Sequence, residues 1–239
     1  ELACVAALLS PSTGIIDAHA YMLALQGYVE GHGGSVVLRC RVQRIERDTG
    51  AYRVVAGGDS SGAITCRNLV LAAGLHGTGL GRTLTYAHPY QVPETYYAKG
   101  QYYALSGRSP FTRHIYPLPD DAWLGLHATV DIGGRCKFGP DIEWIDGLDY
   151  SFAPEKLEKF LSFIRSYYPG LDVERLHPDY TGIRPKLYRE GEPVPDFAIH
   201  GPETHSLPGL VALYGIESPG LTASLAIGEV VAGMLARGT

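Results

Sequence analysis

Two apolar runs, each ending in a glycine-rich turn that leads toward a helix, constrain the fold of this chain most. The first is Asn68-Leu-Val-Leu-Ala-Ala-Gly74, and the second is Gly209-Leu-Val-Ala-Leu-Tyr-Gly215. An uninterrupted apolar run of this length is typical of a strand that is covered on both faces. We therefore expect both segments to be strands of an α/β sheet, with the turns after them exposing backbone N–H groups to a ligand.

The chain between these runs has a different pattern. After His88-Pro89, aromatic and polar residues alternate between Gly, Pro and Asp breaks, which predicts antiparallel strands at 96–105, 113–117, 122–129 and 135–139. Helices are predicted at 14–34, with Asp17 as its N-cap, and at 151–168 and 222–237. The segment 35–66 reads as strands of a β-meander. The sequence thus predicts a mixed α/β (α+β) chain, divided into 1–88, an antiparallel-sheet domain at 89–177, and a return to the first part at 178–239.

Charge and cysteine content exclude several classes of protein. The net charge is −5 and no run of Lys or Arg exceeds two residues, so a nucleic-acid partner is not expected. The four cysteines are widely spaced without a CxxC pair, which indicates reduced thiols in a cytoplasmic protein and no metal site. The sequence contains no apolar stretch long enough to span a bilayer and no pattern of a signal peptide.

A glycine pattern follows the first apolar run, and it has two interpretations. Gly77-x-Gly79-x-Gly81 suggests a nucleotide-binding fingerprint, but no Lys-Ser/Thr follows it and no ribose-binding acid on a second strand is evident. The alternative is a tight strand-to-helix turn, in which small residues at 72–74 allow a ligand close to the backbone. We favour the second interpretation.

Three further segments contain candidate functional residues. Arg184, fixed by Pro185 and next to Gly182, is a planar fork suited to a carboxylate, although a surface arginine is the ordinary alternative. The turn Ser218-Pro-Gly220 before a Thr-opened helix offers free N–H groups to an anion or an electron-rich ring edge, or is a simple helix cap. His127, in an apolar strand, is either a buried structural histidine or a general base.

Taken in order, these segments resemble the glycine oxidase/D-amino-acid oxidase superfamily of FAD-dependent oxidoreductases, and within it the L-2-hydroxyglutarate dehydrogenase/oxidase branch. The likeness is carried by residues 9–17, 42–45, 70–76, 99–102, 115–119, 126–129, 182–185 and 217–222. The resemblance implies an FAD/NAD(P)-binding Rossmann-like domain with an inserted substrate domain of antiparallel sheet and helix. The family opens with a strand and a GxGxxG turn that these residues lack, so we expect the chain alone to bind FAD poorly and to be inactive.

The resemblance also implies roles for particular residues. The residues that resemble FAD contacts are Val42, Ala72, Ala73, Gly74, His76, Pro219, Gly220, Leu221 and Thr222. Arg184 resembles the arginine that binds the substrate carboxylate, and His127 is the candidate base that accepts the hydroxyl proton while a hydride passes to flavin N5. Tyr102 and Tyr116 are candidate substrate contacts. No metal is expected.

We therefore expect oxidation of a small 2-hydroxy acid such as L-2-hydroxyglutarate, with oxygen or a quinone-type carrier as the electron acceptor. Two alternatives stay open at this point: an amine or amino-acid oxidase of the glycine or sarcosine oxidase kind, and an inactive domain with a binding or structural role. The expected location is the cytoplasm, and peripheral association with the inner membrane is left open.

Overall fold

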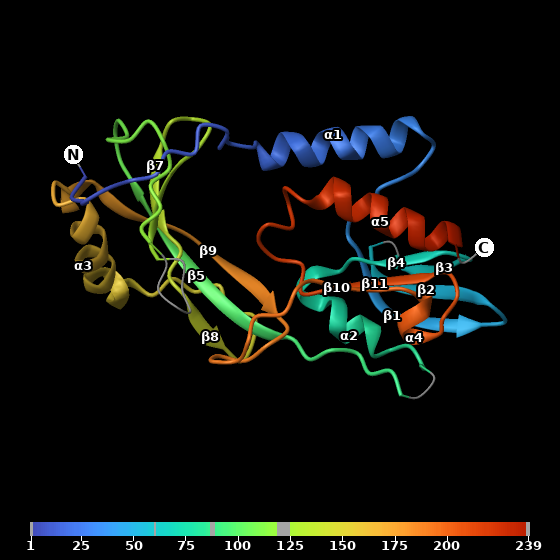
Figure 1. Cartoon of the computed structure of the whole chain (residues 1–239). Helices are drawn as coiled ribbons and strands as arrows, with labels where there is room; N and C mark the ends of the chain where they lie inside the picture. Colours follow the sequence, from blue (N-terminus) through green and yellow to red (C-terminus); the bar gives the residue numbers. More distant parts are fainter. Residues whose placement is uncertain (1, 60, 87–88, 119–124, 238–239) are drawn as a thin grey trace. The chain divides into compact units, whose positions relative to one another are not determined.

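The computed structural model describes residues 2–59, 61–86, 89–118 and 125–237. The chain folds into two compact units (Figure 1). Unit 1 comprises residues 1–24 and 97–183, and unit 2 comprises residues 25–96 and 184–239. These bounds differ from the predicted ones, because residues 1–24 cluster with the antiparallel sheet and because residues 178–183 belong to the same unit.

Unit 1 is built on an antiparallel sheet, in which β5 alternates between buried and half-buried residues from Lys99 to Leu105. The sheet order is β6-β7-β5-β8, and β9 also pairs with β5; Figure 1 labels β5, β7, β8 and β9. Its strands are β5 (Tyr96–Leu105), β6 (His127–Val130), β7 (Cys136–Gly139), β8 (Glu143–Ile145) and β9 (Leu176–Lys186). A strand places successive side chains on opposite faces, so every second residue of β5 faces the core.

One face of this sheet is covered by helix α3 (Leu157–Tyr167), which follows a short 3₁₀ turn at Pro154–Lys156. Pro154 is at the start of that turn, where its missing N–H costs nothing. Phe160 and Ile164 of α3 are fully buried and pack in one core cluster with Tyr103 and Phe138 of the sheet. A second 3₁₀ turn, Val173–Arg175, leads into β9 and is capped by Asp172, which accepts the N–H of Glu174.

Unit 2 contains two small sheets. One is the β-meander β1 (Cys40–Asp48), β2 (Ala51–Gly58) and β3 (Gly62–Cys66), and the other has the order β10-β11-β4. The strands of the second sheet are β4 (Leu69–Leu71), β10 (Ala198–His200) and β11 (Leu210–Tyr214). Helices α2 (Gly77–Gly81), α4 (Pro202–His205) and α5 (Ser224–Arg237) complete the unit. Its core cluster includes Ile45, Tyr52, Leu71, Leu210 and Tyr214.

The predicted elements are found at most of their expected places. Helix α1 (Ala18–Gly31) begins after Asp17, whose Oδ1 accepts the N–H of Ala20 at 3.0 Å, so the predicted N-cap is confirmed. The meander is also confirmed, and its first strand begins only after Arg39, which has a positive φ of 53°. The predicted strand at 113–117 is wrong, because this segment makes only an isolated bridge between Ile115 and Ala128. The beginning of the strand predicted at 122–129 lies outside the described residues.

The expectation that residues 68–74 form a strand covered on both faces is also wrong. Strand β4 is three residues long, and in the described part of the chain it is the end strand of its sheet, with Val70 41% exposed.

Among the described residues, no helix is both long and apolar enough to cross a membrane.

Candidate functional site

The two apolar strands of unit 2 are neighbours and end at the same edge of their sheet. β4 and β11 are parallel, with Leu71 opposite Ala212. Because parallel strands end together, the segment 72–74 after β4 and the segment 215–220 after β11 leave from adjacent strand ends. Three residues that resemble FAD contacts (Ala72, Ala73 and Gly74) thus follow one strand, and a fourth, Pro219, lies in the turn that follows the neighbouring strand. His76 follows in a 3₁₀ turn and is exposed, and Val42 of β1 packs against the same core cluster as Ala73.

The glycine pattern after β4 is explained by close packing. A Cβ on Gly81 would collide with the hydroxyl of Tyr214, and a Cβ on Gly77 would lie 3.3 Å from the Leu213 carbonyl oxygen. Gly79, in contrast, has open space. Two of the three glycines therefore allow helix α2 to approach the end of β11, which agrees with a tight strand-to-helix turn rather than an independent nucleotide fingerprint.

The turn after β11 packs tightly on the end of β9. Gly215 has a positive φ of 66°, and a Cβ there would lie 2.6 Å from the Leu187 side chain. After the turn, the N–H of Ala223 donates to the carbonyl of Pro219 at 3.0 Å. In the part of the chain that the structure describes, the N–H groups of Leu221 and Thr222 donate to no backbone carbonyl. Leu221 and Thr222 lie in the turn directly before α5, which begins at Ser224.

A pocket of about 270 Å³ lies between the end of β9 and this turn. Most of its lining is apolar, but it includes the carboxylates of Asp196 and Glu217. The lining residues are Pro185, Leu187, Tyr188, Val194, Pro195, Asp196, Phe197, Gly215, Glu217, Ser218 and Pro219. Pro219, which resembles a flavin contact, lines this pocket. The volume of the pocket is slightly below the range of about 300–1,000 Å³ that is usual for ligand pockets.

Arg184 belongs to a three-residue ionic cluster that the sequence did not reveal. Its Nη1 lies 3.4 Å from Oε2 of Glu217, and Nζ of Lys186 lies 2.6 Å from Oε1 of the same carboxylate. The Lys186 and Glu217 side chains are only 10% and 13% exposed, whereas that of Arg184 is 36% exposed. We call Arg184, Lys186 and Glu217 the charge cluster. Alternation along the strand could have indicated that Arg184 and Lys186 share a face, but not that Glu217 joins them.

Three predicted residues of unit 1 lie on the sheet face opposite α3. Tyr102 alternates with the core residue Tyr103, and its ring lies where a Cβ of Gly139 would be. Gly139 is in turn the register partner of His127 on β6. The His127 ring stacks on Tyr116 with ring centroids 3.9 Å apart. The structure therefore brings Tyr102, Tyr116 and His127 onto one face, where His127 is 7% exposed.

Aromatic and cationic groups extend this face. Tyr180 of β9 stacks on Tyr102 with ring centroids 4.6 Å apart, and Nζ of Lys137 lies 5.0 Å from the centre of the Tyr180 ring. Lys137 also pairs with Asp179 at 2.8 Å. The sequence analysis missed Tyr180 and Lys137, because their position depends on the pairing of β9 with β5.

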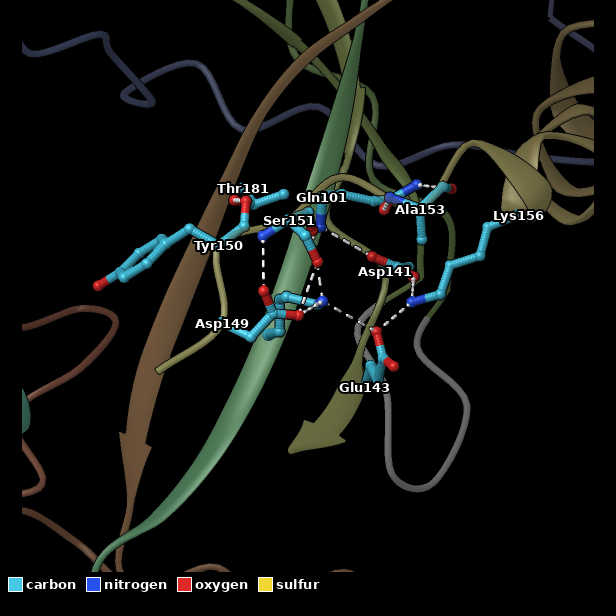
Figure 2. A network of polar contacts seen from close by, with 10 residues as sticks. Gln101, Asp141, Glu143, Asp149, Tyr150, Ser151, Ala153, Lys156 and Thr181 are labelled. Atoms are coloured by element: carbon cyan, nitrogen blue, oxygen red, sulfur yellow. Dashed lines mark hydrogen bonds and ion pairs between the residues drawn. The ribbon is translucent and has the colours of Figure 1, made fainter. Parts of the chain in front are cut away.

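A polar network fixes the other side of β5 (Figure 2). Gln101, 1% exposed, donates from its side chain to the carbonyl of Ala153 and accepts the Ala153 N–H, both at 3.0 Å. Asp141 accepts the backbone N–H of Gln101 at 2.8 Å and the Lys156 ammonium at 3.0 Å. Lys99, 5% exposed, donates to Asp149 at 2.9 Å.

The same network lowers the pKa of its outer carboxylates and links a further strand. Hydrogen bonding from Lys156 lowers the pKa of Glu143, and hydrogen bonds from Ser151 and Lys99 lower the pKa of Asp149. The Thr181 hydroxyl on β9 donates to the Tyr150 carbonyl at 2.7 Å (Figure 2). The network therefore ties the segment 149–156 to both β5 and β9, which stiffens the strands that carry Tyr102 and Tyr180.

Unit 2 contains a buried group of tyrosines and histidines. The Tyr90 hydroxyl and Nδ1 of His200 are 2.9 Å apart, and Nε2 of His205 is 3.2 Å from the His200 carbonyl oxygen. Burial lowers the pKa of both histidines and raises that of Tyr90 to about 12. These histidines are thus held neutral. Among the described residues, no group of His, Cys, Asp and Glu side chains could hold a metal ion.

The comparisons with known proteins agree on a family. The family model "FAD dependent oxidoreductase" (DAO) matches residues 2–234. L-2-hydroxyglutarate dehydrogenase of Arabidopsis thaliana, a mitochondrial protein, is 39% identical over 99% of this chain and 57% of its own length. Glycerophosphate oxidase from Mycoplasma pneumoniae, solved with FAD bound, superposes with a TM-score of 0.75 and 20% identity over 91% of this chain and 55% of its own.

A further solved structure, glycine oxidase from Bacillus cereus, has a TM-score of 0.65 and 20% identity over 87% of this chain and 52% of its own. The chain thus spans about half the length of the proteins that it matches. At such identities the solved structures show the fold alone, whereas the family model covers nearly the whole chain. The chain belongs to the family of FAD-dependent oxidoreductases.

Proposed function

We propose that this chain serves an FAD-dependent dehydrogenase or oxidase that acts on a small 2-hydroxy acid of the 2-hydroxyglutarate type. The observation that carries the proposal is the 39% identity to a plant L-2-hydroxyglutarate dehydrogenase along 99% of this chain. A glycerol 3-phosphate dehydrogenase is 25% identical, so the hydroxy-acid assignment is favoured over a phosphate ester.

The residues present fit a flavin on chemical grounds. Small residues follow β4, an apolar pocket lies beside Pro219, and the N–H groups of Leu221 and Thr222 are available to an electron-rich ring edge. These residues would hold the ring, and backbone N–H donors beside it would stabilise negative charge on it. The flavin, when bound, accepts the hydride.

The chain's own residues would then bind and deprotonate the substrate. Arg184 binds the carboxylate, because its guanidinium shares Glu217 only loosely, at 3.4 Å, and is the most exposed member of the charge cluster. His127 accepts the hydroxyl proton on a ring nitrogen, and its ring lies against that of Tyr116 at 3.9 Å between centroids. Tyr102 contributes an aromatic wall on the same sheet face.

The test combines flavin binding with substrate choice. The purified 239-residue chain is titrated with FAD, and flavin reduction by L-2-hydroxyglutarate, glycine and sarcosine is followed under anaerobic conditions. Reduction by the hydroxy acid supports the proposal, and reduction by the amines alone would replace it with an amine oxidase. Because the GxGxxG turn is absent from these residues, weak FAD binding by the chain alone is expected; a chain that still binds no FAD when the family's GxGxxG segment is supplied would indicate a binding or structural role. Reoxidation by oxygen or by a quinone analogue then identifies the electron acceptor.

Two substitutions test the assigned roles. His127→Ala should lower hydroxy-acid turnover at least about 100-fold, the lower end for loss of a general base. A neutral amine can lose a hydride without a base, so the same substitution should leave amine turnover unchanged. Arg184→Lys should raise the KM for the hydroxy acid by about tenfold or more, because an ammonium cannot make the bidentate contact. Unchanged turnover in His127→Ala, with the fold retained, would remove His127 from the mechanism.

A further inference from the structure

The charge cluster has an arrangement that bears on which anion it accepts. It contains two cations, Arg184 and Lys186, and one carboxylate, Glu217, so its net charge is +1. The carboxylate is not shared equally: Lys186 lies 2.6 Å from it and Arg184 lies 3.4 Å from it. The surplus positive charge is therefore located on Arg184, which is also the most exposed of the three.

Burial of Lys186 and Glu217 strengthens the electrostatic attraction between them. The Lys186 and Glu217 side chains are 10% and 13% exposed, so the lysine depends on the carboxylate for its partner. Nζ of Lys186 also lies 5.1 Å from the centre of the Tyr188 ring, a contact that further restricts the ammonium. Because the Glu217 carboxylate balances the charge of Lys186, only the Arg184 cation is available to an incoming anion.

We propose that Glu217 is a specificity-determining residue that sets the cluster to accept a singly charged carboxylate and to reject a doubly charged phosphate. This rests on the proposed role of Arg184 as the partner of the substrate anion. A carboxylate needs one positive charge to balance it, and Arg184 supplies that charge in a planar fork. A phosphate monoester at neutral pH carries nearly two negative charges, and the second would face the Glu217 carboxylate.

Glu217 also connects the turn after β11 with the end of β9, both of which belong to unit 2. It lies directly before Ser218-Pro219 at the start of the turn that lines the pocket, and its carboxylate reaches the end of β9. The N–H of Gly220 donates to the Glu217 carbonyl, so the backbone of this residue is fixed as well. The position of the carboxylate is thus determined by the turn after β11 and not by a mobile side chain alone.

The experiment measures anion binding to the 239-residue chain by calorimetry, without added FAD or turnover. Glutarate, which at neutral pH carries one negative charge on each of two separate carboxylates, is the carboxylate probe, whereas sulfate carries two charges, and inorganic phosphate between one and two, on a single tetrahedral group. Glu217→Gln should raise the affinity for phosphate and sulfate at least about tenfold, the lower end for a gained charge-assisted hydrogen bond, and should change glutarate binding much less. The double variant Lys186→Met/Glu217→Gln restores a charge of +1 and should return phosphate binding to the original level.

A second variant separates charge from folding. Lys186→Met leaves Arg184 facing Glu217 alone with no net charge, so glutarate binding should weaken at least about tenfold, a loss comparable to one charged hydrogen bond. Glu192→Gln removes an exposed carboxylate of the same unit, outside the cluster, and is the matched control. Thermal unfolding of every variant shows whether the fold is retained.

The inference would be overturned if Glu217→Gln changed the affinities for glutarate and phosphate equally, or if Lys186→Met left the affinity for glutarate unchanged. A wild-type chain that binds neither anion would overturn it as well. A chain that binds glutarate and responds as expected, but reduces no flavin with a hydroxy acid, would instead contradict the proposed function and leave the selectivity of the cluster standing.

Discussion

Replacement of Asp141 gives the sharpest test of the polar network in unit 1. The Asp141 side chain is 1% exposed and satisfies two donors, the Gln101 N–H at 2.8 Å and the Lys156 ammonium at 3.0 Å. In Asp141→Ala the buried N–H of Gln101 loses its partner, which costs about 1–3 kcal/mol. The lost charged hydrogen bond to Lys156 costs less than the usual value of about 1.5–3 kcal/mol, because Lys156 is 22% exposed and keeps Glu143 at 2.6 Å.

The sum is a destabilisation of about 3 kcal/mol for Asp141→Ala, near the cost of breaking a buried ion pair. Asp141→Asn keeps an oxygen for the Gln101 N–H and loses only the charge, so it should cost about 1 kcal/mol, a typical net hydrogen-bond contribution. Glu158→Ala, on the exposed side of α3, should lie within about 0.5 kcal/mol of the parent.

Urea unfolding followed by tryptophan fluorescence is the appropriate assay, because both tryptophans of the sequence fall within 97–183. A loss of 3 kcal/mol should lower the urea midpoint by about 1–3 M for ordinary m-values. If Asp141→Ala and Asp141→Asn are equally destabilised, the backbone contact to Gln101 contributes nothing measurable. If Asp141→Ala loses less than about 1 kcal/mol, below the smallest cost of one orphaned buried donor, the network does not hold the segment 149–156.

Two further predictions concern unit 2. Gly81→Ala should destabilise the chain by about 1–3 kcal/mol, the usual cost of overpacking, because its Cβ would meet the Tyr214 hydroxyl. The control Gly79→Ala, whose Cβ has open space, should be neutral or slightly stabilising. Equal denaturant midpoints for the two variants would disprove the packing argument. Burial lowers the folded-state pKa of His200 and His205, so the stability that they contribute is complete above the unfolded-state value of about 6.5 and is lost as the pH falls below it. The free energy of unfolding should therefore be lower at pH 5.5 than at pH 7.5, and a pH-independent value across that window would contradict it.

The sequence predicted the strands that are defined by their own alternation. The bounds of β5 at 96–105 match because polar and aromatic residues alternate over ten positions, and the period of two is a local property. The N-cap at Asp17 is likewise local. In contrast, the apolar run at 68–74 predicted a strand covered on both faces, and Val70 is 41% exposed, because burial depends on which neighbours lie beside a strand.

The candidate site was only partly accessible to sequence reasoning. Tyr102 was identified by resemblance and His127 from its place in an apolar strand, but Gly139, which leaves room for the Tyr102 ring beside His127, is recognised only from the register of β7 with β6. Lys186 and Glu217 are 31 residues apart, so no local pattern indicates that they pair. A buried lysine or glutamine in an otherwise apolar strand, as at Lys99 and Gln101, is the one signal that could have indicated the network.

The strict alternation of β5 has a consequence for how this protein can vary. Odd-numbered positions from 99 to 105 support the network and the core, whereas Tyr102 and Ala104 face away from α3. Exchanges at Tyr102 and Ala104 should therefore disturb the core less than exchanges at their neighbours, whereas Gly100 has no room for a side chain, since its Cβ would lie 2.7 Å from Pro140. Insertion of a single residue between Gly100 and Gln101 would exchange the two sets and disrupt the network and the core at once.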